Sequence, residues 1–208
     1  MALMKSGEAS PLRRIEPREY ARNVDGLLAQ INDPSPAVRR WAARDLATHP
    51  QAAAALCGRL AVETDASVRA VLFSSVSTLG GTQVVDGLLP LLRSENPALR
   101  NGAIEAPAGL PADVAPRIEQ LLRDTDSDVR IFTLNLLGDL PHPDVPQWLS
   151  QVLNHEPEAN VVGAALEVLA EVGTPDSLGP LRVARERFAD DPFITFAADV
   201  ALERIESP

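Results

Sequence analysis

Apolar residues recur along this chain with the period of one face of an α-helix. One such face lies after position 127 and is formed by Val129, Phe132, Leu136, Leu137 and Leu140. A proline-containing break at 141–143 follows, and a second face begins directly after it, made of these residues: Val145, Trp148, Leu149, Val152 and Leu153. No stretch alternates convincingly between apolar and polar residues as a strand does. The pattern therefore predicts paired helices in an all-α protein.

The helix pairs belong to a repeat. Its segments share an apolar anchor that is usually followed by Arg, and the anchors are Val38, Val68, Leu99, Val129, Val161 and, more weakly, Ile194. Successive anchors are 30, 31, 30, 32 and 33 residues apart. A pair of amphipathic helices of about a dozen residues each cannot bury both apolar faces alone, so neighbouring pairs must stack around a shared core. The sequence predicts a right-handed α-solenoid of about five helix pairs.

We predict a single repeat domain over residues 15–205, preceded by a flexible segment at 1–14. A helix at 17–31 is expected to cap one end, and a single helix at 190–205 to close the other. The units between them are expected at 33–63, 64–94, 95–124, 125–156 and 157–189. In unit three, Gly102, Pro107 and Gly109 interrupt the first helix, because proline removes an intrahelical hydrogen bond. We expect a kink near Pro107, a local change in curvature and a recess.

The units resemble HEAT repeats, in the short form also called HEAT-like or phycobilin-lyase-type repeats. The resemblance covers about residues 33–205 and rests on an apolar-Arg pair with a polar or acidic residue six positions before the Arg. These pairs are Asp33 with Arg39, Glu63 with Arg69, Ser94 with Arg100 and Asp124 with Arg130. The resemblance implies that they form a hydrogen-bonded ladder between layers, a role that suits the planar donor fork of Arg. Unit five has Glu156 but Val162 in the Arg position.

Four arginines in register could instead line a site for an anionic partner, and we favour the ladder. The charge of the chain supports this choice. The net charge is −10, divided into +2 over residues 1–69 and −12 over residues 70–208. Proteins bind phosphate backbones with basic side chains, so we expect no nucleic-acid partner. Acidic residues interleave the basic ones of the N-terminal stretch, namely Lys5, Arg13, Arg14, Arg18 and Arg22, which favours a solvated helix face there.

The remaining composition bounds the location of the protein. No apolar run approaches the roughly 20 residues that cross a membrane, so we expect no membrane partner. The sequence has one cysteine and opens with no secretory signal pattern. We therefore predict a cytoplasmic protein.

The sequence contains few candidates for chemistry. His49, His142 and His155 lie in different units, so we expect loop histidines and no metal site. The HEAT-like di-iron deoxyhypusine hydroxylases carry His-Glu pairs in several repeats, whereas only His155-Glu156 occurs here, and we reject that activity. No acyl-transfer signature accompanies Cys57, which is expected to pack in the interior. The Gly80-Gly81 turn lacks the following Lys and Ser or Thr of a phosphate loop.

The two tryptophans allow two interpretations. Trp41 and Trp148 each lie three residues after an apolar anchor, Val38 or Val145, so we expect both to pack in the core. The alternative is that they stack on a nucleobase or a tetrapyrrole. The DNA-glycosylase branch of HEAT-like proteins stacks DNA on aromatic residues inside a basic groove, and this acidic sequence does not provide one. We predict no catalytic residue and no cofactor.

In HEAT-like arrays the second helices line the concave surface. The phase of the core places the following residues outward on that surface: Asp86, Arg93, Glu119, Gln120, Arg123, Gln147, Gln151, Asn154, Arg182 and Arg185. This mixture of charges and amides suits a polypeptide more than a polyanion. We predict a non-catalytic scaffold, adaptor or assembly factor that binds another protein and is itself a monomer or weak dimer. The resemblance implies an alternative, a lyase or chaperone that handles a bilin-type tetrapyrrole or the protein that carries it.

Overall fold

The computed structural model describes residues 20, 21 and 23–207. The expected flexible segment at 1–14 lies outside these residues, as does the beginning of the expected capping helix at 17–31. The described part of the chain is helical and contains no strand.

The helices alternate between two layers. The first helices of the units are α2 (Pro36–Leu46), α4 (Ala66–Leu79), α6 (Pro97–Ala108), α8 (Ser127–Asp139) and α10 (Ala159–Val172). The second helices are α3 (Ala53–Val62), α5 (Thr82–Leu88), α7 (Pro111–Leu121), α9 (Val145–His155) and α11 (Leu178–Arg187). Helix α1 (Val24–Gln30) precedes the first pair, and α12 (Pro192–Glu206) follows the last. Short 3-10 helices, η1 (Pro50–Ala52), η2 (Leu89–Arg93) and η3 (Pro175–Ser177), adjoin α3, α5 and α11.

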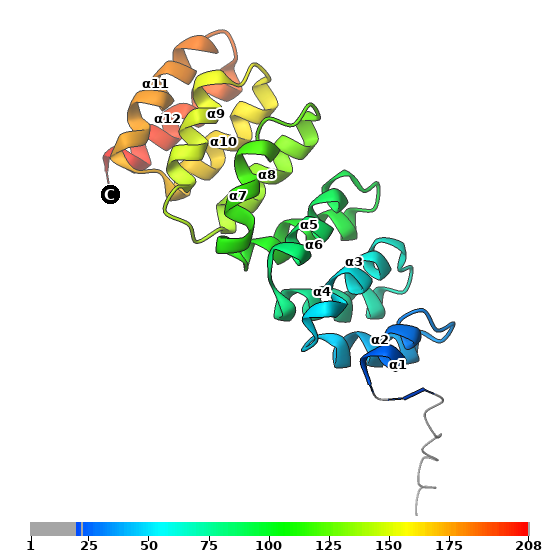
Figure 1. The fold of residues 1–208 in the computed structure, drawn as a ribbon. Coiled ribbons are helices and arrows are strands. Elements are labelled where there is room, and N and C mark those ends of the chain that lie inside the picture. The colour runs from blue at the N-terminus through cyan, green and yellow to red at the C-terminus, as the bar shows by residue number, and fades with distance from the viewer. Residues whose placement is uncertain (1–19, 22, 208) are drawn as a thin grey trace, which may run out of the picture.

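The units stack one on the next, so the molecule is an elongated array with α1 at one end and α12 at the other (Figure 1). The first helices pack in series from α2 to α12. In the other layer α3 packs on α5, α5 on α7, and α9 on α11. The structure is thus an α-solenoid, as the sequence predicts.

Side-chain caps begin most of the first helices. The residue before the helix accepts a hydrogen bond from a backbone N–H of the first turn in four cases, namely Asp65, Asn96, Asp126 and Asp191. Prolines stand at the start of α2, α6 and α12, where their missing N–H has no intrahelical partner to lose. Helix α10 has neither signal, but their recurrence before the other helices of this layer helps to explain the regular spacing.

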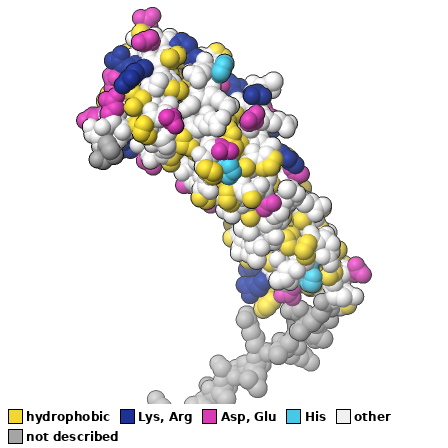
Figure 2. Space-filling model, turned by 60° about the vertical axis from the view of Figure 1, so that its left-hand side comes forward, with side chains coloured by type: hydrophobic (Ala, Val, Ile, Leu, Met, Phe, Trp, Pro, Cys, Tyr) yellow, Lys and Arg dark blue, Asp and Glu magenta, His cyan; other side chains and the backbone are white. Residues whose placement is uncertain are grey.

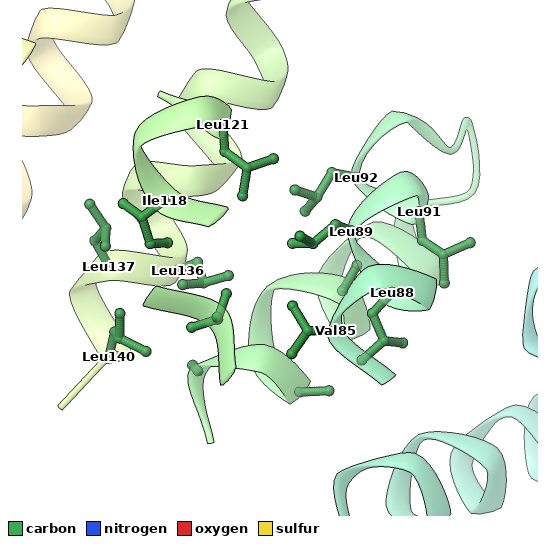
Figure 3. Packing of buried hydrophobic residues seen from close by; sticks show 14 of the residues in the cluster. Val85, Leu88, Leu89, Leu91, Leu92, Ile118, Leu121, Leu136, Leu137 and Leu140 are labelled. Carbon is green, nitrogen blue, oxygen red and sulfur yellow. The ribbon is translucent and has the colours of Figure 1, made fainter. Parts of the chain in front are cut away.

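The core is a continuous band of Leu, Val and Ala side chains between the layers. Figure 3 shows how neighbouring units share it: Leu89 and Leu92 of η2 point toward Leu121 of α7 and Leu136 of α8. Burying such side chains is worth about 1.5–3 kcal/mol each, and here the partners come from different units. Each unit therefore depends on its neighbours for stability.

One glycine permits an unusually close contact in the layer of first helices, which is called the outer layer below. A Cβ atom on Gly102 of α6 would lie 2.1 Å from Cζ of Phe73, whose ring projects from α4. A recess of about 360 Å³ lies beside this contact and is lined by small residues, including Ala70, Ser77 and Ala106. This recess lies between α4 and α6 beside Gly102, whereas the recess predicted for unit three was expected from a kink at Pro107.

One predicted detail of the helices is wrong. Helix α6 is not interrupted near Pro107, because this residue lies in the last turn and only Ala108 follows it in the helix. In unit two the second helix ends as an α-helix at Leu88 and continues as a 3-10 helix from Leu89 to Arg93. Pro90 cannot donate the hydrogen bond that an α-helix requires at that position.

The packing prediction holds for one tryptophan and fails for the other. Trp148 is buried, with 7% of its surface exposed, whereas Trp41 is 51% exposed. Trp41 lies on the outer layer and packs against Arg44, whose guanidinium carbon is 5.8 Å from the ring centre. A position three residues after the anchor thus lies at the edge of the buried face of α2, not within it.

Candidate functional site

Arg39 and Glu63 connect the first two units. Arg39 Nε and Nη2 donate to the two carboxylate oxygens of Glu63 at 2.7 and 2.8 Å, and Arg39 Nη1 donates to the Asp33 carbonyl at 2.8 Å. Glu63 also accepts from Arg59 Nε at 3.0 Å and from the Asp65 amide at 2.9 Å. Burial alone would raise the pKa of Glu63, but these hydrogen bonds outweigh burial and lower the pKa to about 2.

A second bidentate pair connects units four and five. Arg130 Nε and Nη2 donate to Glu156 at 2.8 and 2.9 Å, and Arg130 Nη1 donates to the Asp124 carbonyl at 2.8 Å. In both pairs the Arg binds the carbonyl of the residue six positions before it. It also binds the carboxylate at the junction with the next unit, six positions before the Arg position of that unit. The carboxylate partner is therefore 24 or 26 residues later in the chain.

The two central arginines are held differently. Arg69 and Arg100 donate to the carbonyls of Glu63 and Ser94 at 3.0 and 2.7 Å, and the guanidinium of Arg100 lies 5.5 Å from the Phe132 ring centre. The Asp124 carboxylate, which would be the partner of Arg100 by the geometry of the other units, accepts instead from Arg93. Burial alone would raise the pKa of Asp124, but hydrogen bonds from the Asp126 amide and from Arg93 lower it.

Unit five replaces its missing Arg from another helix. Arg187, at the end of α11, donates to the carbonyls of Asn154 and Glu156 at 2.9 and 2.6 Å. Its position corresponds to no part of the repeated Arg motif, so sequence reasoning missed it. Arg187 occupies the role that Val162 cannot fill, and the connection between the last units is retained.

Four of the ten residues predicted on the concave surface form ion pairs with residues outside that set. They are Asp86 with Arg117, Arg93 with Asp124, Arg182 with Glu206 and Arg185 with Asp199. The arginine partners lower the pKa values of Asp86 and Asp199. The other six residues lie on two neighbouring second helices or just beyond them: Glu119, Gln120 and Arg123 at α7, and Gln147, Gln151 and Asn154 on α9.

Helices α7 and α9 are neighbours that do not pack closely on each other, unlike the other consecutive second helices of the described chain. A cavity of about 690 Å³ fills the space between them. Its lining comes from α7, the start of α8, α9 and the connecting loops: Glu119, Leu122, Arg123, Asp124, Arg130, Trp148, Gln151, Val152, His155, Glu156 and Pro157. A volume of this size is typical of pockets that bury drug-sized molecules.

Trp148 provides the aromatic wall of the cavity. It lies three residues after the buried Val145 of α9. The equivalent position in α5 is Gly87, where a Cβ atom would come within 2.7 Å of Cys57 on α3, the preceding second helix. A glycine thus brings α5 close to α3, whereas a tryptophan keeps α9 away from α7. The ring of His142 stacks on Trp148 with 4.9 Å between centroids and fixes its orientation.

The rim of the cavity carries both signs of charge. Arg123 is well exposed and lies 3.6 Å from Glu119, a looser ion pair than the bidentate pair of Arg130 with Glu156. The Arg123 guanidinium can therefore turn toward an incoming anionic group at little cost. On the face seen in Figure 2, basic and acidic side chains are likewise intermixed toward the end of the molecule away from the grey chain.

The other candidate residues do not form a reactive site. Within the described residues no group of His, Cys, Asp or Glu is arranged to hold a metal ion. Cys57 is buried, and burial raises the pKa of its thiol to about 11. His49 and His142 are half-buried and His155 is exposed. His155 nevertheless lines the cavity, a position that the sequence did not predict. The available signal for the cavity was Trp148, which stands where α5 has Gly87.

No helix in the described part of the chain is long and apolar enough to cross a membrane. 

Comparison with known families agrees with this architecture. The family model for HEAT repeats matches residues 24–108 and 114–203, and the chain therefore belongs to the HEAT-repeat family. A relative is the bilin biosynthesis protein PecE of Mastigocladus laminosus, which is 30% identical over 154 residues. The matched region covers 71% of this chain and 56% of PecE, so this chain spans little more than half of the length of that relative.

Solved structures with a similar course of the chain are more distant. The designed armadillo repeat protein YIII(Dq)4CqI has a TM-score of 0.43 and 17% identity, with 88% of this chain and 100% of that chain covered. The complex of CpcE and CpcF of phycocyanin lyase from Nostoc sp. PCC7120 has a TM-score of 0.37 and 15% identity, with 96% and 100% covered.

Proposed function

We propose that this HEAT-repeat protein is a chaperone-type binding protein that holds a bilin, an open-chain tetrapyrrole, in the cavity between α7 and α9. The similarity to PecE supports the choice of ligand class. We assign no covalent attachment of the bilin to this chain, because its one cysteine, Cys57, is buried with a raised pKa and cannot serve as a nucleophile.

The observation that carries the proposal is the composition of the cavity wall. A bilin has an extended conjugated system, pyrrole N–H donors and two carboxylates. Trp148 contributes the small exposed part of its ring to contact with the conjugated system, and Arg123 offers a guanidinium for a carboxylate. The carboxylates of Glu119 and Asp124 line the same cavity and can accept hydrogen bonds from N–H groups. The volume of about 690 Å³ is in the range that accommodates a molecule of this size.

A polypeptide partner is the second candidate, and the exposed polar row across α7 and α9 favours it. Gln120, Gln147 and Asn154 are exposed beside the cavity, and they supply donors and acceptors without a single sign of charge. A protein that carries a bilin would meet both the cavity and this row. A scaffold that binds an unmodified polypeptide would use the row alone.

Titration with biliverdin tests the proposal. We expect a saturable shift of the visible absorbance of biliverdin and quenching of Trp148 fluorescence at one equivalent. Arg123→Ala should weaken binding about tenfold, because hydrogen bonds to charged groups are worth about 1.5–3 kcal/mol. The matched control is Arg182→Ala, which removes another exposed arginine of a second helix outside the cavity. An unchanged spectrum, or equal effects of the two variants, would show that the cavity does not bind this ligand.

The polypeptide candidate has a separate test. Reversing the charge of Arg93 and Arg123 together should weaken capture of a protein partner in pull-downs from source lysate while circular dichroism stays unchanged. If the double variant still captures the partner and the wild-type chain does not bind biliverdin, the concave surface serves neither candidate function.

A further inference from the structure

Helix α12 carries an exposed apolar strip beside the face that packs on α10 and α11. Phe193 and Phe196 are 57% and 69% exposed, and Val200 is partly exposed. The spacing of i, i+3 and i+7 places these three side chains on one face of the helix. The packed face, with Ile194, Ala198 and Ala201, is fully buried against α10 and α11. The strip is therefore additional to the apolar face that holds α12 in the fold.

The strip is unlike the equivalent face of every earlier first helix. The residues at the positions of Phe193, Phe196 and Val200 are found by counting from each repeat anchor. They are Ala37, Arg40 and Arg44 in α2; Ser67, Ala70 and Ser74 in α4; Ala98, Asn101 and Glu105 in α6; Asp128, Ile131 and Asn135 in α8; Asn160, Gly163 and Glu167 in α10. Of these fifteen residues, only Ile131 is large and apolar. The outer side of the solenoid is thus polar or small until α12, where it becomes aromatic.

Two contacts show that the strip is firmly positioned. The Phe193 ring packs against α10 at Gly163, where a Cβ atom would lie 2.8 Å from Cε1 of the ring. Arg185 of α11 donates to both oxygens of Asp199 at 2.5 and 3.2 Å and holds α12 on its other side. A preformed apolar surface loses little conformational entropy when another helix covers it.

Acidic side chains border the strip on one side. Asp199, Glu203 and Glu206 follow each other at i, i+4 and i+7 along α12. Asp199 and Glu206 are paired with Arg185 and Arg182, and Glu203 is exposed. The chain as a whole carries a net charge of −10, which opposes contact with a second copy. A partner with basic residues beside its own apolar face would instead be attracted.

We propose that the strip formed by Phe193, Phe196 and Val200 is a docking site for an amphipathic helix of another protein, one that has Lys or Arg along the flank of its apolar face. The docked helix lies along the exposed side of α12. Its apolar residues cover the two phenylalanine rings, and its basic flank lies along Glu203 and the neighbouring acids. The site is separate from the cavity between α7 and α9.

The test uses two synthetic helical peptides with the same leucine stripe, one flanked by Lys and the other by Glu. With fluorescence anisotropy, we expect the Lys-flanked peptide to bind the wild-type chain more tightly than the Glu-flanked peptide. The double variant F193S/F196S should weaken that binding at least about tenfold, since burial of one Phe side chain is worth that factor or more. The control variant is Val62→Ser, which removes an exposed apolar side chain on α3.

The outcomes separate the possible occupants. Equal loss of binding in Val62→Ser and F193S/F196S would mean nonspecific attraction to an acidic protein and would overturn the proposal. Equal binding of the two peptides would show that the partner helix needs no basic residues and would overturn the proposal. A wild-type dimer by light scattering that becomes monomeric in F193S/F196S would assign the strip to a second copy and overturn the proposal as well. Biliverdin binding is expected to be unchanged in both variants.

Discussion

The Arg39–Glu63 connection allows a quantitative test of how much one inter-unit pair contributes to stability. Glu63 is buried and accepts hydrogen bonds from Arg39, Arg59 and the Asp65 amide. Its pKa is about 2 in the folded chain, against 4.5 as the ordinary value. This difference corresponds to about 3 kcal/mol of folding free energy. The substitution Glu63→Gln keeps the shape of the side chain and removes its charge, and it leaves Arg39 buried without a carboxylate.

The sign of the pH dependence follows from the lowered pKa. On acidification the unfolded chain takes up the proton first, so the contribution of Glu63 is present above pH 4.5 and is lost as the pH falls toward 2. We therefore expect Glu63→Gln to lower the free energy of unfolding by about 3 kcal/mol at pH 7. The difference from wild type should shrink progressively between pH 5 and pH 2.

Urea unfolding followed by circular dichroism at 222 nm, repeated at pH 7, 5, 4 and 3, measures this difference. The control is Asp86→Asn, which removes a carboxylate from an exposed pair with Arg117 and should change stability little. A loss below about 1 kcal/mol at pH 7, or a loss that does not depend on pH, would contradict the reasoning. Either result would mean that packing of the units, not this pair, holds them together.

Three further predictions concern packing, the last connection and the buried thiol. Gly102→Ala should lower the melting temperature, because the added methyl overlaps the Phe73 ring of α4. Gly58→Ala in α3 has open space and should raise the melting temperature slightly. Differential scanning fluorimetry compares the two variants with wild type. Arg187→Ala removes two hydrogen bonds to loop carbonyls and should destabilise the chain by about 1–3 kcal/mol, while Arg182→Ala should have little effect in the same urea experiment. Cys57 should react with iodoacetamide at pH 8 only after unfolding, since burial keeps the thiol protonated; fast labelling of the native chain, seen by mass spectrometry, would contradict this.

The fold could be predicted because its signals are local and repeated. The units share one apolar spacing, and four of the five share the Arg, so the same signal occurs several times within the chain. The Arg motif identified the donors that bind the preceding loop. It did not reveal that the carboxylate partner belongs to the following unit, since this depends on how far each unit turns relative to the last.

The candidate site was predictable only in part, for a related reason. The phase of α7 and α9 placed Glu119, Arg123 and Gln151 on the exposed side, and all three line the cavity. The cavity itself depends on the separation of two helices that are distant in sequence, which no local pattern records. The contacts of Arg187 and the exposure of Trp41 were not predicted. These residues lie in the last and the first helix pair, whose neighbours differ from those of the central units.

The loose contact between α7 and α9 has a mechanical consequence. Helices α6 and α8 remain packed beside it, so the array can bend at this point by opening or closing the α7–α9 side while the α6–α8 contact is kept. Bending that closes the space would bring Arg123 toward Trp148 and tighten the walls around whatever occupies it. The curvature of the whole rod, and the distance between its two ends, would then report whether the cavity is filled.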